Sequence, residues 1–155
     1  MDLKKKFIPK GKISKFDVDM FEKYDIPARN KVKEILKEFI FDNPDRYGAD
    51  MIIKSDNKCK YKYLELQVCT QWKNEKFPYK NVYIWERKGK YDNDTLFLTL
   101  SRDLSMGYLF DTSKLDKEKP RRYKKYSREF VYDIPWNQVM LVHMEHFTKQ
   151  MIEDF

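Results

Sequence analysis

The spacing of the hydrophobic residues changes near residue 44, and the change predicts a helix followed by a β-hairpin. From Ala28 to Ile40 the apolar residues follow the i, i+4, i+7, i+8 spacing of an amphipathic helix. The segment 25–27 favours a helix start, with Pro27 in the first turn, and Asn43-Pro44 favours a stop. We therefore expect a helix whose apolar stripe covers a sheet.

The β-hairpin is predicted over residues 48–69. Its first arm is 48–53, a polar turn follows at 55–58, and the second arm is 61–69. Strand alternation sends successive side chains to opposite faces. One face of the second arm then carries Leu64, Leu66 and Val68, and the other carries Glu65, Gln67 and Cys69.

The rest of the chain is predicted to be mainly β-structure with a helix at each end. A short helix is expected at 17–24 and a closing helix at 136–154, although 139–142 could be a strand instead. The order of elements predicts an α/β (α+β) fold, a mixed sheet of about five to six strands flanked by helices. Further strands are expected at 81–87, 95–101, 106–110 and, as an edge strand ended by Pro135, at 129–134.

The length and composition predict one intracellular domain. The 155 residues fit a single domain over 1–155, with a basic arm at 1–16. No apolar run is long enough to span a membrane, and no apolar segment follows the basic N-terminus as in a signal peptide. The two cysteines have no metal-site or disulfide spacing, so we expect reduced thiols in the cytoplasm or nucleus and no secretion.

Positive charge is concentrated in the segment 114–128, which holds eight basic residues and two acidic ones in a chain of net charge +7. A local basic patch favours a polyanionic partner, with nucleic acid first and a membrane surface second, although a solvated loop would look similar. Basic residues interleaved with aromatic ones suit a phosphate backbone and unstacked bases. The predicted nucleic-acid-binding residues are Arg121, Arg122, Tyr123, Lys124, Lys125, Tyr126 and Arg128.

Two acids lie in the hairpin where strands usually carry apolar residues. A carboxylate inside a strand must be solvated, ion-paired or bound to a cation. Asp50 opens the first arm and Glu65 lies midway along the second, so the two side chains can converge. Paired carboxylates suit Mg²⁺ or Mn²⁺, and such a site can hydrolyse a phosphodiester, with Gln67 orienting the attacking water. The alternative is that Asp50 caps a turn at the strand entry and that Glu65 is a solvent-facing residue of an edge strand, paired with a lysine.

The order helix, Asp50, then Glu65-x-Gln67 on the next strand resembles the PD-(D/E)XK (restriction-endonuclease-like) nuclease superfamily. The resemblance covers about 27–110 and implies a Mg²⁺-dependent endonuclease acting on DNA in preference to RNA. It also implies a helix acid, for which Glu34 or Glu38 is the candidate. Members of large DNA viruses are similar, which would place the chain in a host cell or virion, and a homodimer is consistent with this class.

One position departs from the family pattern, because Gln67 stands where the motif has lysine. Some enzymes of this class with Glu-x-Gln are active, while other altered members are not. Lys54 or Lys73 could replace the missing lysine. The alternative function is a catalytically inactive nuclease-fold protein that binds nucleic acid or has a structural role.

Overall fold

The α/β class predicted from the sequence is confirmed by a three-layer arrangement, in which a mixed sheet has helices on one face and a smaller sheet on the other. The computed structural model describes residues 21–54, 59–73, 76–115, 119–122 and 129–155. Its helices and strands are η1 (Phe21–Asp25), α3 (Ile26–Leu36), η2 (Lys37–Phe39), β1 (Ile40–Asp42), β2 (Met51–Ile53), β3 (Tyr63–Cys69), β4 (Val82–Trp85), η3 (Glu86–Lys90), β5 (Thr95–Ser101), β6 (Met106–Phe110), β7 (Arg121–Arg122), β8 (Phe130–Ile134), η4 (Trp136–Gln138), β9 (Met140–His143), η5 (Met144–His146) and α4 (Lys149–Asp154).

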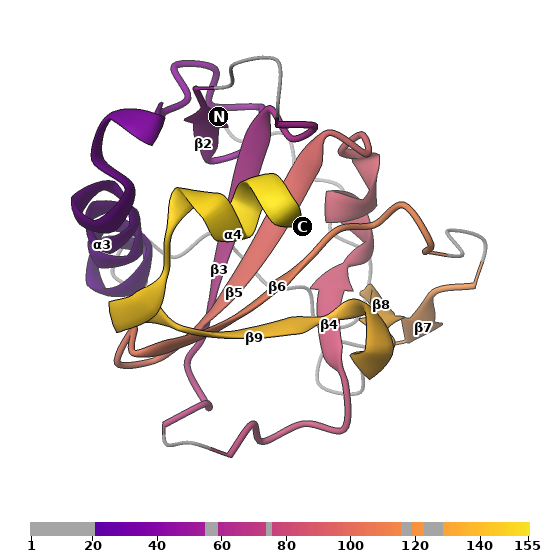
Figure 1. The fold of residues 1–155 in the computed structure, drawn as a ribbon. Helices are drawn as coiled ribbons and strands as arrows, with labels where there is room; N and C mark the ends of the chain where they lie inside the picture. The colour runs from indigo at the N-terminus through magenta and orange to yellow at the C-terminus, as the bar shows by residue number, and fades with distance from the viewer. Residues whose placement is uncertain (1–20, 55–58, 74–75, 116–118, 123–128) are drawn as a thin grey trace, which may run out of the picture.

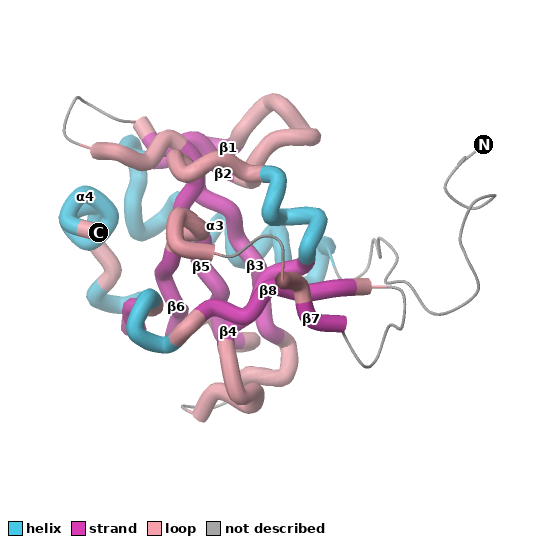
Figure 2. The backbone as a smooth tube through the Cα atoms, turned by 90° about the vertical axis from the view of Figure 1, so that its right-hand side faces the viewer, coloured by secondary structure: helices cyan, strands magenta, loops and turns pink. Residues whose placement is uncertain are grey.

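The main sheet has the strand order β1-β2-β3-β5-β6-β9, and every neighbouring pair is antiparallel except β3 and β5. The parallel pair needs a long crossover, which runs through β4 and η3. Strand β4 lies outside the main sheet and belongs to a second sheet with the strand order β4-β8-β7. Figure 2 shows this second sheet beside β3 and β5.

The face of the main sheet that carries Leu64 and Leu66 is covered by the helices. Ala28 and Val32 of α3 pack in the same cluster, together with Ile152 of α4. Figure 1 shows α4 crossing in front of β3 and β5. Each fully buried aliphatic side chain stabilises the fold by about 1.5–3 kcal/mol, so the alternation in β3 is what fixes this face inward.

The opposite face of the main sheet packs against the second sheet. Phe97 of β5 and Phe110 of β6 stack with ring centroids 5.4 Å apart. They are buried with Val82 and Ile84 of β4 and Ile134 of β8. Because odd-numbered residues of β3 share this face, Glu65 and Gln67 lie between the two sheets.

The first predicted helix is confirmed from Ile26 but is wrong beyond Leu36. Lys37 has a φ of 48°, which takes the backbone out of the right-handed helix. A 3₁₀ turn follows, and Ile40 then pairs with Ile53 in β1. The apolar stripe continued through Ile40 in the sequence, so its spacing concealed the change from helix to edge strand.

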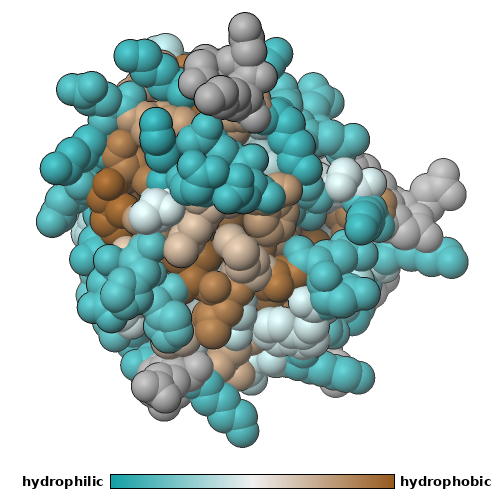
Figure 3. Space-filling view, viewed as in Figure 1, coloured by the Kyte–Doolittle hydropathy of each residue, from teal (hydrophilic) through white to brown (hydrophobic). Residues whose placement is uncertain are grey.

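The predicted closing helix is wrong over most of its length, and the alternative strand is confirmed. Met140–His143 forms β9, which pairs antiparallel with β6, and helix α4 begins only at Lys149. The β-branched Val142 is buried in this strand, while Leu141 is 45% exposed on the other face. Apolar surface gathers near β9 in the space-filling view (Figure 3).

The hairpin and the other predicted strands are present, but two of the strands lie in the second sheet. Met51 pairs with Leu64, which confirms the hairpin. The third predicted strand is β4, outside the main sheet. The segment 129–134 was predicted as an edge strand, but β8 lies between β4 and β7. The arm 1–16, most of the helix predicted at 17–24 and the turn at 55–58 lie outside the described residues.

No helix among the described residues is long and apolar enough to cross a membrane.

Candidate functional site

The hairpin register brings Asp50 and Glu65 together. Because Met51 pairs with Leu64, the preceding residue Asp50 lies beside Glu65. The backbone N–H of Asp50 donates to Glu65 Oε1 at 3.0 Å, and the backbone N–H of Leu66 donates to Asp50 Oδ2 at 2.8 Å. Each carboxylate is therefore held by the backbone of the strand that carries the other.

Two basic side chains complete the cluster, and neither lies in the hairpin. Arg29 of α3 donates to Asp50 Oδ1 at 2.6 Å. Lys88 of η3 ion-pairs with Glu65 Oε2 at 3.2 Å. The side chains of Lys88 and Glu65 are 19% and 6% exposed, so this ion pair is largely shielded from water. All four carboxylate oxygens of Asp50 and Glu65 thus have donors from the protein.

The cluster strongly perturbs the ionisation of Glu65. Burial is the main cause and raises its pKa to about 7; Lys88 opposes the rise, while the charge of Asp50 adds to it. The pKa of Asp25, at the N-terminus of α3, is also raised, by desolvation and then by the charge of Asp50. The pKa of Tyr91 is raised by burial and by Glu65 and Asp50. Burial and the neighbouring carboxylate of Asp50 therefore both disfavour the charged form of Glu65.

The structure brings together two of the ligands that a hydrated divalent cation takes. Mg²⁺ keeps several waters and typically takes one or two carboxylates together with substrate phosphates. Asp50 and Glu65 supply two carboxylates whose charges repel unless a proton or cation lies between them. Among the described residues no group of three or more acidic, histidine or cysteine side chains is placed to hold a metal ion. The other ligands would have to be water and substrate.

Gln67 lies on the same strand face as Glu65, but its amide is used elsewhere. Its Nε2 donates to the backbone oxygen of Tyr83 at 3.0 Å and to the Thr99 hydroxyl. Tyr83 belongs to β4 and Thr99 to β5, so Gln67 links the two sheets. The predicted water-orienting role would have to come from its Oε1.

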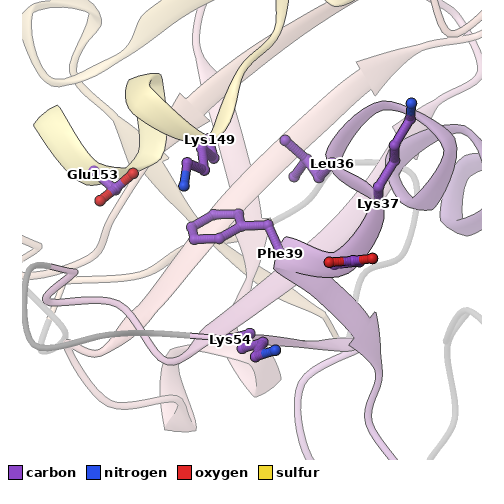
Figure 4. Close-up of a pocket in the computed structure, with 7 residues that line it drawn as sticks. Leu36, Lys37, Phe39, Lys54, Lys149 and Glu153 are labelled. Atoms are coloured by element: carbon purple, nitrogen blue, oxygen red, sulfur yellow. The ribbon is translucent and has the colours of Figure 1, made fainter.

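The two helix acids are exposed and away from the hairpin carboxylates. Glu34 lies on the outer side of α3, and Glu38 lines a separate cavity of about 490 Å³ between η2 and α4. Lys54 lines this cavity as well, and Figure 4 shows the ring of Phe39 pointing toward Lys149 across it. Lys73 is exposed as well. The acid of the helical segment that interacts electrostatically with Asp50 is instead Asp25.

The predicted nucleic-acid-binding segment is described only in part. Arg121 pairs with both carboxylate oxygens of Asp133, at 2.7 and 3.0 Å. The backbone of Arg122 pairs with that of Phe130 in the second sheet. The remaining residues predicted to bind nucleic acid, Tyr123, Lys124, Lys125, Tyr126 and Arg128, lie outside the described residues.

Sequence reasoning missed Lys88, Arg29 and Asp25. Lys88 is one of several lysines in a polar segment, and only the crossover between the parallel strands carries it back to Glu65. Arg29 could have been found, because it lies one turn into a helix that must pack beside the hairpin.

Comparison with protein-family models, curated proteins and solved structures gave no significant match to this chain.

Proposed function

We propose that the chain is a Mg²⁺-dependent nuclease that hydrolyses phosphodiester bonds, with DNA favoured over RNA as the substrate. The observation that carries the proposal is the meeting of Asp50 and Glu65 on adjacent strands, with Lys88 paired to Glu65. A buried acid with a strongly raised pKa, next to a second acid and a lysine, is typical of a functional centre.

The topology around the two acids supports the same proposal. A helix comes first, Asp50 immediately precedes β2, and Glu65 lies on β3. Strand β3 then pairs in parallel with β5, which makes the sheet mixed. This is the arrangement that the resemblance to PD-(D/E)XK nucleases implies for the Asp and the Glu-x-Lys strands.

In this proposal Asp50 and Glu65 would hold Mg²⁺, or Mn²⁺ in its place. A cation held there would supply positive charge for the phosphoryl oxygens and lower the pKa of a coordinated water. Lys88 takes the role of the lysine that Gln67 replaces, because its ammonium already contacts Glu65. If Glu65 bound a cation instead of Lys88, the Lys88 ammonium would be available to donate a hydrogen bond to a substrate phosphate oxygen.

Arg29 has a positioning role. Its guanidinium donates to Asp50 Oδ1 and, at 3.4 Å, to the Asp50 backbone oxygen. Together with the hydrogen bond from the Leu66 N–H, these hydrogen bonds fix the side chain of Asp50. Arg29 also places a positive charge against the proposed cation, so it limits the affinity of the free site.

A second candidate is a catalytically inactive protein of this fold that binds nucleic acid or has a structural role. The observation in its favour is that Arg29 and Lys88 already provide positive charge at both carboxylates. Such an ion-paired cluster can be stable without a metal ion.

The test is cleavage of end-labelled single-stranded, duplex and branched DNA, and of the matching RNA, in Mg²⁺, in Mn²⁺ and in EDTA. The nuclease proposal expects cleavage with either cation and none in EDTA. Binding without cleavage under all conditions would support the second candidate.

A further inference from the structure

A cavity of about 170 Å³ opens between the main sheet and β4, directly beside the acid cluster. It is smaller than the roughly 300–1,000 Å³ of pockets that hold drug-sized ligands, so it suits one planar ring system. Lys88 lines it and also contacts Glu65, so the cavity adjoins the proposed reaction centre. Its lining residues are Gln67, Val68, Cys69, Phe77, Tyr83, Trp85, Arg87, Lys88 and Thr99.

Aromatic rings form one wall of the cavity. Tyr83 and Trp85 are two residues apart on β4 and so lie on the same face of the strand. Their rings meet edge to face with centroids 5.9 Å apart. Trp85 is half-buried, and the guanidinium of Arg87 lies 5.2 Å from its ring centroid. Trp85 therefore presents aromatic surface to the cavity, and an indole is the kind of side chain on which a flat base stacks.

The polar groups of the cavity suit the edge of a heterocycle. Gln67 donates through Nε2 to Tyr83 and Thr99, and no described residue donates to its Oε1. Thr99 accepts that hydrogen bond, so its hydroxyl proton is free to be donated. A fixed amide oxygen and a hydroxyl provide one acceptor and one donor.

The described residues that line the cavity include Arg87 and Lys88 and no acidic residue, so their charge is positive. In the part of the chain that the structure describes, Arg87 pairs with Glu129 and Lys88 with Glu65. A guanidinium has five N–H donors and an ammonium three, so both retain donors for phosphate oxygens. Aromatic faces, an amide and cations together are the chemistry that recognises an unstacked base with its phosphate.

We propose that this cavity binds one unpaired nucleobase of a single-stranded nucleic acid, next to the phosphodiester at Asp50 and Glu65. The proposal rests on the proposed nuclease function and specifies its substrate, which is a single strand or an unpaired end. A base inside a duplex is stacked and paired, and it would have to leave the helix to enter. A free nucleotide carries the same base and could enter the same cavity, but it lacks the neighbouring phosphates of a strand.

The test measures binding by the full-length protein in EDTA, where cleavage does not interfere. Fluorescence anisotropy compares a labelled single-stranded oligonucleotide, its blunt duplex and competition by a nucleoside monophosphate. Trp85→Ala is expected to weaken single-strand binding by about tenfold, as loss of one base–aromatic stack does, and to leave duplex binding almost unchanged. Trp85→Phe keeps an aromatic face and should retain most of the affinity.

Phe41→Ala is the matched control, because Phe41 is 45% exposed on β1 and does not line the cavity. It should bind both substrates like the wild type, and circular dichroism confirms that each variant is folded. Equal losses for single strand and duplex, or wild-type binding by Trp85→Ala, would overturn the inference. So would competition by the monophosphate at the affinity of the oligonucleotide. Cleavage is measured separately in Mg²⁺, so an inactive protein whose single-strand binding depends on Trp85 would refute only the nuclease proposal.

Discussion

The carboxylates of Asp50 and Glu65 each accept a hydrogen bond from the backbone of the other arm of the hairpin. The N–H of Asp50 donates to Glu65 Oε1, and the N–H of Leu66 donates to Asp50 Oδ2. Two acids that would repel each other in isolation are thereby fixed side by side. The repulsion is relieved by Arg29, by Lys88 and by the raised pKa of Glu65. A divalent cation bound between the two carboxylates would relieve the same repulsion.

The raised pKa of Glu65 makes folding stability depend on pH. Its ordinary value is 4.5 and its value in the folded chain is about 7, so the folded state binds this proton more tightly than the unfolded state. The resulting stability is fully present below pH 4.5 and is lost as the pH rises through 7, by about 3 kcal/mol in total. Glu65→Gln cannot ionise and should lose this part of the pH dependence.

The measurement is urea denaturation of the wild type and Glu65→Gln in EDTA from pH 4.5 to 8. The unfolding free energy of the variant is expected to improve relative to the wild type as the pH rises. Titratable groups that do not interact with Glu65 are the same in both proteins, so they cancel in the difference. Parallel pH profiles for the two proteins would show that Glu65 titrates normally.

Lys88→Met removes the proposed functional lysine. Lys88 lowers the pKa of Glu65, so the variant should have an even higher Glu65 pKa and lose about 10²–10³-fold in the rate of Mg²⁺-dependent cleavage. Lys88→Arg keeps the charge and should retain part of the rate. Lys90→Met is the control, since Lys90 belongs to the same 3₁₀ helix and contacts Tyr91 and the Tyr47 backbone. Equal rates for Lys88→Met and Lys90→Met would exclude this role.

Gln67→Ala separates the water-orienting role expected from the sequence from the hydrogen bonds in the structure. Removal of the hydrogen bonds to Tyr83 and Thr99 should lower the unfolding free energy by about 1–3 kcal/mol, because it leaves a carbonyl between the sheets without its donor. If Lys88 is the functional side chain, the cleavage rate should change only a few-fold. A folded, stable variant with a large loss of rate would instead favour the water-orienting role.

The basic segment is tested by replacing Arg121, Arg122, Lys124 and Lys125 with glutamine. DNA binding should weaken, and the slope of log K against log salt should fall by about 0.9 for each phosphate that the variant no longer neutralises. Arg121 alone should contribute least, because Asp133 already pairs with it. Lys149→Gln, in the cavity beside Phe39, serves as the control. An unchanged salt slope for the fourfold variant would refute this interface.

The sequence predicts the hairpin well because strand alternation is a local property. Leu64 and Leu66 face the helices and Glu65 faces away from them because the period is two, and no distant interaction is needed to fix this. The adjacency of Asp50 and Glu65 then follows from the hairpin alone.

The parts that the sequence does not reveal depend on interactions between distant segments. The spacing of apolar residues in Met140–His143 is compatible with either a helix or a strand, and the segment forms a strand because it pairs with β6. Helix α3 ends because Lys37 adopts a positive φ, and a lysine side chain gives no indication of that backbone conformation. Lys88 reaches Glu65 only because the crossover between parallel strands returns to the same face of the sheet.

The most direct test of the nuclease proposal is the rate at which Asp50→Asn and Glu65→Gln cleave labelled DNA in Mg²⁺, beside the wild type. The wild type is expected to cleave the DNA, and each variant is expected to lose at least about 10²-fold in rate with its fold and DNA binding retained. Exposed Glu34→Gln serves as the matched control and should cleave like the wild type. Wild-type rates in both site variants, or no cleavage of any substrate by the wild type in Mg²⁺ or Mn²⁺, would contradict it.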